Sequence, residues 1–347
     1  MDGSQRKASF VRPLELGLLA VGLTLASYAG AEQQAVSIVQ DPTAVGVPVG
    51  KREAKIVKFT LEAEEVLGVL DKEQSRTYMY WTFNGKVPGP LLRARVGDTI
   101  EITLKNKSDS AMIHNIDLHA VWGQGGGAGA TSVAPGDEKS FSFKALHPGL
   151  FVYHCATPII PQHISSGMYG MILIEPEGGL PKVDREFYLM QGDIYADDLR
   201  ASLDVGNTGT ANTVFNLDRM LAEQPTYVVM NGSAGALAAN PMKAKVGETV
   251  RVFFGVGGPN LISSFHVIGT VFDRVYNQAS LTSPPLTDVQ TTLVPPGGAT
   301  IVEMKLRAPA NYIFVDHALS RLMKGNVAIL KAEGEAVPEV FQPGKLK

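Results

Sequence analysis

Four short motifs occur in the same order in each half of this chain. They are an Asn-Gly turn, a Val-Gly-Asp/Glu-Thr segment, a Val-x-Pro-Gly turn and an apolar segment that ends in histidine. The first set begins at Asn84, Val96, Val133 and Leu150, and the second at Asn231, Val246, Val294 and Tyr312. We therefore expect two copies of one domain, at residues 56–178 and 179–332, which suits a length of 347 residues. We expect residues 32–55 to form an irregular arm before them and residues 333–347 to form a tail.

The sequence of the first copy predicts short strands separated by turns. Ile56–Leu61 alternates apolar and polar residues, and Thr77–Phe83 is rich in aromatic residues and threonine, as strands are. Further strands are expected at Thr99–Leu104, Phe141–Phe143, Leu150–Tyr153 and Met171–Ile174. The 36 glycines and 21 prolines suit many turns. The sequence thus predicts an all-β chain of two tandem β-sandwich domains, with a helix expected at Phe215–Glu223.

The first residues are typical of an export signal. Arg6, Lys7 and Arg12 precede an apolar run at Leu16–Ala26, and a small-residue cleavage site ends at Ala31. The run is shorter than the roughly 20 apolar residues that span a membrane. We expect residues 1–31 to be a cleaved signal peptide, the mature chain to be periplasmic, and no stable membrane anchor to remain.

Charge patterning excludes one class of partner. The net charge is −3, and the charged residues, 19% of the chain, do not gather in blocks. A nucleic-acid interface needs a concentrated basic patch, so we expect no nucleic acid as partner. Small anions and proteins remain open.

The only cysteine, Cys155, lies in a set of metal-binding residue types. His114 precedes it, and His163 and Met168 follow it at short spacings. Two imidazoles, a thiolate and a weak thioether are the ligands of a trigonal copper site. Met168 as core filling, His163 as a turn residue, and a structural zinc site are the alternatives, although Met is a poor zinc ligand.

His154 adds a second metal hypothesis. It is adjacent to Cys155 on an expected strand, so the two side chains point to opposite faces. An outward histidine is usually a surface residue, but His119 and His317 also have no role at the first site. Three imidazoles with one open position are typical of a catalytic metal site.

Three further residues complete the second hypothesis. Asp117 lies two residues before His119, so both face the same way and the carboxylate can deliver protons. His266 lies opposite His114 in the repeat and can project into the same pocket, and Ile268 shares its face. A salt-bridged Asp117 and a buried, hydrogen-bonded His266 are the structural alternatives. The glycine-rich segment Gly123–Gly129 lacks the Lys-Ser/Thr of a phosphate-binding loop and is expected to be a flexible turn.

These motifs together resemble the two-domain copper nitrite reductases. The resemblance runs from about residue 50 to 332 and is carried by the segments 112–120, 151–156, 163–170, 264–269 and 315–317. It implies two cupredoxin-like Greek-key sandwiches, in a homotrimer with two coppers per chain. Type 1 copper would be held by His114, Cys155, His163 and Met168. Type 2 copper would be held by His119 and His154 of one chain and His317 of its neighbour.

The resemblance also implies a reaction, NO₂⁻ + 2H⁺ + e⁻ → NO + H₂O. A small redox protein, a cytochrome c or a cupredoxin, would reduce type 1 copper, and the electron would pass through the Cys155–His154 pair. Asp117 and His266 match the catalytic pair of the family, and Ile268 matches its substrate-shaping residue. The eight-residue step from Cys155 to His163 resembles the shorter ligand loop of one branch.

Two other functions are weighed against this one. A two-domain laccase-type oxidase needs more histidine ligands than the seven in this chain, and Asp117 and Ala156 stand where that chemistry needs histidine. A single-copper electron carrier leaves His119, His154 and His317 without a role.

Overall fold

The computed structural model describes residues 34–199 and 211–344. The expected signal peptide lies outside the described residues. Within them, no helix is both long and apolar enough to cross a membrane.

The first sandwich consists of two four-stranded sheets with the strand orders β2-β1-β4-β6 and β3-β8-β7-β5. The first sheet contains β1 (Ile56–Asp71), β2 (Arg76–Phe83), β4 (Thr99–Asn106) and β6 (Glu138–Lys144). The second contains β3 (Leu92–Arg95), β5 (Asp117–Leu118), β7 (Gly149–His154) and β8 (Tyr169–Glu175). Alternate residues of these strands, such as Leu61, Ile102 and Ile172, meet in one buried core between the sheets.

The second sandwich consists of two five-stranded sheets with the orders β12-β9-β14-β18-β16 and β13-β20-β19-β15-β17. The first sheet contains β9 (Arg185–Ile194), β12 (Tyr227–Met230), β14 (Thr249–Gly258), β16 (Arg274–Tyr276) and β18 (Ala299–Lys305). The second contains β13 (Met242–Lys245), β15 (Ser263–Ile268), β17 (Thr291–Val294), β19 (Ala310–Asp316) and β20 (Ala328–Glu333). Its core includes Phe254 and Phe265, whose rings are stacked with centroids 3.8 Å apart.

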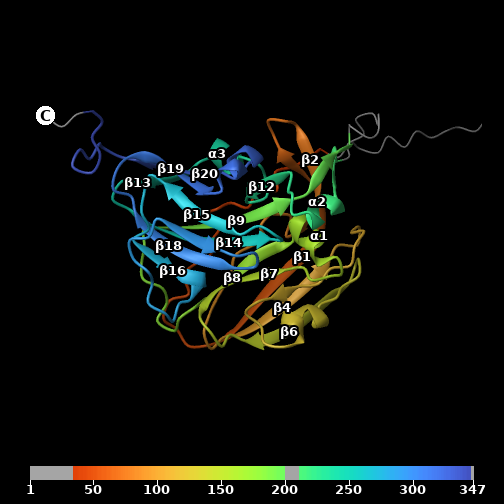
Figure 1. Ribbon diagram of the computed structural model, residues 1–347. Helices are drawn as coiled ribbons and strands as arrows, with labels where there is room; N and C mark the ends of the chain where they lie inside the picture. Colours follow the sequence, from red (N-terminus) through yellow and green to blue (C-terminus); the bar gives the residue numbers. More distant parts are fainter. Residues whose placement is uncertain (1–33, 200–210, 345–347) are drawn as a thin grey trace, which may run out of the picture. The chain divides into compact units, whose positions relative to one another are not determined.

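A third core lies where the two sandwiches meet. Leu150 and Val152 of β7 and Met171 of β8 pack in one cluster with Tyr188 of β9 and Phe253 of β14. In Figure 1, β7 and β8 lie between β4 and β6 of the first sandwich and β14 and β18 of the second. Because neighbouring side chains of a strand point to opposite faces, β7 is covered by protein on both sides.

A buried ion network also joins the two sandwiches. Glu186 of β9 accepts hydrogen bonds from Arg93 of β3 at 2.7 Å and from Arg251 of β14 at 2.8 Å. Arg93 also pairs with Glu175, and Arg251 pairs with Glu303. These five side chains are each less than 10% exposed. Each buried charge therefore has an opposite charge beside it, as its desolvation requires.

The expected strands of the first sandwich are confirmed. The expected helix forms as α2 (Leu217–Leu221), shorter than predicted, with the Asn216 side chain accepting the Arg219 N–H at its N-terminus. Residues 34–55 are irregular, as expected, with single bridges Val36–Gly68 and Val39–Val87 to the first sandwich. The boundary at residues 178 and 179 stays a prediction; it falls between β8 and β9.

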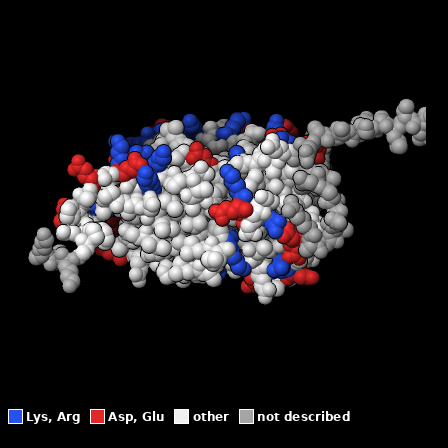
Figure 2. Space-filling view, turned by 90° about the horizontal axis from the view of Figure 1, so that it is seen from above, with Lys and Arg blue, Asp and Glu red and all other residues white. Residues whose placement is uncertain are grey.

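The remaining short elements are α1 (Ile160–Ser165), α3 (Ala236–Ala239), η1 (Gln124–Ala130), η3 (Asn277–Ala279), η4 (Leu319–Lys324), β10 (Ala196–Asp198) and β11 (Thr213–Phe215). The predicted turn at Gly123–Gly129 falls largely in η1, where left-handed backbone angles at three successive glycines interrupt the 3-10 helix. On the face drawn in Figure 2, basic and acidic side chains lie among one another beside a broad uncharged area.

Candidate metal centres

The first donor set lies at one end of the first sandwich. Cys155 directly follows β7, His163 belongs to α1, and His114 is paired with Val133 by a short bridge. The Cys155 Sγ lies 3.3 Å from His163 Nδ1 and 3.8 Å from His114 Nδ1. All three side chains are buried. The structure therefore brings together three residues that are up to 49 positions apart in the sequence.

These distances fit a shared metal ion. Bonds of about 2.0 Å to nitrogen and about 2.3 Å to sulfur, at tetrahedral to trigonal angles, place the two donor atoms roughly 3.5–3.8 Å apart. Desolvation lowers the pKa of His114 to about 3 and that of His163 to about 4, so both imidazoles are neutral. Burial raises the pKa of the Cys155 thiol, which a bound soft cation would counteract by replacing its proton.

Backbone hydrogen bonds bring Met168 to the same place. The Cys155 N–H donates to the Met168 carbonyl at 3.1 Å, and the Met168 N–H donates to the His163 carbonyl at 3.1 Å. Met168 is fully buried in the core that contains Cys155. The fourth predicted ligand thus lies beside the other three.

Two residues that the sequence did not single out support this set. The Asn115 N–H points at Cys155 Sγ from 3.5 Å, and the Asn115 Oδ1 accepts the Ala156 N–H at 2.7 Å. The Trp81 ring lies 4.6 Å from the His163 ring, centroid to centroid. Asn115 follows His114 directly, which was an available signal; Trp81 comes from a distant strand and offered none.

A second group of donors lies on the other face of β7. Among the described residues, two groups of three or more potential ligand side chains come within 4.8 Å of one another. The second group is Asp117, His119 and His154. The two histidine Nε2 atoms are 3.2 Å apart, and Asp117 Oδ2 is 3.8 Å from His154 Nε2. The prediction that His154 and Cys155 face opposite ways, with Asp117 beside His119, is confirmed in this geometry.

Neighbouring backbone groups contact both imidazoles. The Nδ1 of His154 lies 3.1 Å from the Cys155 carbonyl, to which an Nδ1–H can donate. The neutral tautomer that makes this hydrogen bond has its lone pair on Nε2. His119 is exposed, yet its Cε1 approaches Gly297 of the second sandwich so closely that a Cβ there would lie 3.1 Å away. Desolvation and the neighbouring His154 lower the pKa of His119, which keeps this imidazole neutral for metal binding.

His266 and His317 form a separate pair in the second sandwich. Their ring centroids are 5.3 Å apart, and His266 Nδ1 donates to the Gln290 carbonyl at 2.6 Å. Ile268 lies two residues further along β15 and is 40% exposed. Within the described part of one chain, neither histidine belongs to the Asp117 group.

A buried carboxylate holds the turn that begins at His317. Asp316 Oδ1 accepts the N–H groups of Ser264 at 3.1 Å and Ala318 at 3.0 Å. The other oxygen of Asp316 pairs with Arg321 and accepts from Gln191. The position of His317 is therefore fixed from both sides.

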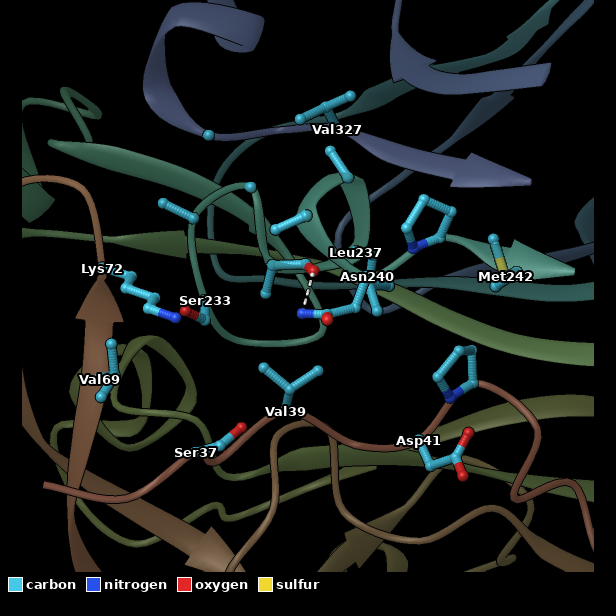
Figure 3. A pocket seen from close by; sticks show the side chains of 18 of the residues that line it. Ser37, Val39, Asp41, Val69, Lys72, Ser233, Leu237, Asn240, Met242 and Val327 are labelled. Carbon is cyan, nitrogen blue, oxygen red and sulfur yellow. Dashed lines mark hydrogen bonds between the residues drawn. The ribbon is translucent and has the colours of Figure 1, made fainter. Parts of the chain in front are cut away.

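A cavity lies away from these residues (Figure 3), and its volume is about 1640 Å³. It is bordered by the arm, by the β1–β2 connection and by the second sandwich, with Val39, Lys72, Leu237 and Val327 among its lining residues. None of the predicted site residues lines it. Its walls offer no imidazole or thiolate, so the metal chemistry belongs to the donor groups described above.

Two cupredoxin sandwiches with a buried His₂Cys set define a copper protein of the multicopper oxidase type, and the family model described as multicopper oxidase matches residues 69–179. A copper-containing nitrite reductase of Neisseria meningitidis serogroup B is 49% identical over 287 residues, covering 82% of this chain and 71% of that protein. The one of Pseudomonas chlororaphis is 34% identical and covers 95% of both chains. The solved copper nitrite reductase of Nitrosomonas europaea superimposes with a TM-score of 0.69 at 32% identity, covering 82% of this chain and 96% of that one. The chain belongs to the copper-containing nitrite reductases.

Proposed function

We propose that this chain reduces nitrite to nitric oxide, NO₂⁻ + 2H⁺ + e⁻ → NO + H₂O. The observation that carries the proposal is the pair Cys155–His154. Cys155 belongs to a buried donor set, and His154 belongs to a second, partly exposed set on the opposite face of the same strand. One peptide bond therefore joins an enclosed site, suited to electron storage, to an open site, suited to binding a small anion.

The donor sets divide the roles between two coppers per chain. His114, Cys155, His163 and Met168 would hold type 1 copper; His119 and His154 would hold type 2 copper together with His317 of a second copy. When bound, copper at these sets supplies the electron and a Lewis acid for nitrite. The separation of His317 from the Asp117 group within one chain supports a ligand shared between copies. A homotrimer closes such a ring of shared sites.

Asp117 and His266 are proposed to supply the protons. Asp117 Oδ2 lies 3.8 Å from His154 Nε2, beside the open side of the second set. The Nδ1–H of His266 donates a hydrogen bond to the Gln290 carbonyl, which orients the ring. Its Nε2 is then available for proton transfer in the proposed reaction. Ile268, exposed on the same strand, would limit the space beside His266 and so shape the nitrite pocket.

Exposed apolar residues surround the first set. Met112 and Ile113 precede His114, and Ile159 and Ile160 precede His163; all four are exposed. A small redox protein, a cytochrome c or a cupredoxin, would dock on this surface and pass its electron inward. We further propose that the chain works in the periplasm after removal of residues 1–31.

Copper content and gas release test the reaction. The copper-loaded chain should contain two coppers with two distinct Cu(II) EPR signals, and ¹⁵N-nitrite with a reductant should yield ¹⁵NO. Cys155→Ala should remove the visible thiolate-to-copper colour but keep the second signal. His147→Ala, a histidine outside both sets, is the control and should keep both. One copper and no ¹⁵NO would favour the electron carrier instead.

Mixed assemblies test the shared site. His119→Ala and His317→Ala should each be inactive when purified alone. Co-expressed, they should regain part of the activity, because one interface combines the intact His119 of one copy with the intact His317 of another. If His317 completed the site of its own chain, the mixture would stay inactive.

A further inference from the structure

The glycine-rich segment Gly123–Gly129, to which the sequence assigns no role, packs directly against Asp117. It lies in η1, five residues beyond β5. Gly125, Gly126 and Gly127 have φ angles of +58°, +64° and +105°, in the left-handed region that favours glycine. Because these three residues have no side chains, their main chain can approach neighbouring groups closely.

Gly126 allows the Asp117 carboxylate its present position. A Cβ on Gly126 would lie 1.7 Å from Asp117 Oδ1, 2.7 Å from its Cγ and 3.1 Å from the Leu118 nitrogen. The other oxygen, Oδ2, is the one that faces His154 Nε2. One oxygen therefore rests on the glycine backbone while the other points to the second donor set.

Contacts on the side opposite Asp117 hold the glycine-rich segment in place. On its other side, a Cβ on Gly127 would lie 2.3 Å from the Phe141 ring, so the loop is wedged between Phe141 and Asp117. The buried Thr131 hydroxyl donates to the Gly127 carbonyl at 3.0 Å and accepts the Ile116 N–H at 3.1 Å. This bridge ties the loop to the strand that carries Asp117.

We propose that Gly126 is a positioning residue for the reaction, which sets the place and rotation of the Asp117 carboxylate beside the second donor set. The inference rests on the proposed function of Asp117. A Cβ at Gly126 requires the carboxylate or the loop to move by about 1.3 Å, from 1.7 Å to the 3.0 Å minimum contact. A displacement of about 1 Å in a reacting group can lower a rate on the order of 10²-fold.

The neighbouring glycine provides a matched control. Gly125 has nearly the same φ as Gly126, but a Cβ there meets nothing nearer than the Ala128 Cβ at 3.9 Å. Gly125→Ala and Gly126→Ala both place an alanine in the left-handed region, so both should lower Tm, and Gly126→Ala should lower it more because of its overlap with Asp117. Both variants should keep both coppers and the colour. Only Gly126→Ala should lower kcat, by about 10- to 100-fold. The rate at which a reductant bleaches the colour should be unchanged in both.

A double-variant cycle separates positioning from general damage. With Asp117→Ala the carboxylate is gone, so adding Gly126→Ala should lower kcat no further than adding Gly125→Ala does. An equal loss of kcat in the presence and absence of the carboxylate would overturn the proposal. So would a Gly126→Ala enzyme as active as Gly125→Ala.

Two measurements keep the test independent of folding and of the proposed reaction. If Gly126→Ala does not fold, Thr131→Val removes the loop tie with little change in volume and should lower kcat several-fold; full kcat would count against the proposal. A crystal structure of Gly126→Ala should show Asp117 displaced by about 1 Å relative to Gly125→Ala. An unmoved Asp117 would refute positioning even in a chain that reduces no nitrite.

Discussion

Removing the charge of Glu186 tests how firmly the two sandwiches are joined. Glu186→Gln keeps the volume of the side chain but leaves Arg93 and Arg251 each without one buried partner. Removing one member of a buried ion pair typically costs about 3–5 kcal/mol. Arg93 keeps Glu175 and Arg251 keeps Glu303, so we expect the lower end, about 3 kcal/mol.

The expected shift in melting temperature follows from chain size. Unfolding entropy is about 2.1 cal/mol/K per residue, or roughly 0.6 kcal/mol/K for a chain of about 300 residues. A loss of about 3 kcal/mol therefore lowers Tm by about 5 °C. Calorimetry measures this shift. Limited proteolysis of residues 176–184, between β8 and β9, should also become faster, because the broken pair with Arg93 spans the two sandwiches.

An exposed pair supplies the control for Glu186. Lys58 and Glu101 are 2.9 Å apart, but their side chains are 69% and 35% exposed. Glu101→Gln should cost less than about 0.5 kcal/mol and move Tm by less than about 1 °C. A folded Glu186→Gln chain whose Tm falls no more than that of Glu101→Gln would refute the role given to the network.

Three further changes have definite expected results. Burial raises the pKa of Asp193 to about 6, so the folded chain holds a proton that the unfolded chain releases above about pH 4, and the free energy of unfolding falls by about 3 kcal/mol as pH rises through this window. Asp193→Asn should flatten the dependence of this free energy on pH, measured by urea titrations between pH 4 and 7. An unchanged slope would contradict the prediction. Phe265→Ala should lower the free energy of unfolding by about 3–5 kcal/mol, because it opens a cavity among stacked rings. The urea midpoint measures this loss, and a loss below about 1 kcal/mol would mean that neighbouring side chains fill the cavity. Arg321→Met should cost about 3 kcal/mol, because it leaves the buried Asp316 carboxylate without its cation. If the proposed second copper is present, its occupancy should fall without a change in the colour, and full occupancy would show that the His317 turn does not depend on this pair.

Local periodicity explains what the sequence could predict. Alternation located the strands of the first sandwich, and adjacency on one strand placed Cys155 and His154 on opposite faces. The helix predicted at Phe215–Glu223 is longer than the observed α2, because the spacing of apolar residues does not show that Asn216 caps the first turn.

Long-range contacts explain what the sequence missed. Arg93 and Glu186 are 93 residues apart, and nothing local to either indicates that they pair. The contact between Gly126 and Asp117 is close in sequence but depends on three successive left-handed glycines, a conformation that composition alone does not specify. The pairing of His266 with His317 depends on the register of β15 against β19, which residue spacing does not specify.

The burial of β7 on both faces limits how the length of this protein can vary. A one-residue insertion or deletion within Gly149–His154 would shift the alternation by one place and exchange the faces of Cys155 and His154. Both donor sets would be lost in a single event, whatever residue was added. The loop between Cys155 and α1 is under no such parity rule, because it is not part of a strand. Changes in length that adapt the donor sets are therefore confined to such loops, and the strand between the two sets must keep its residue count.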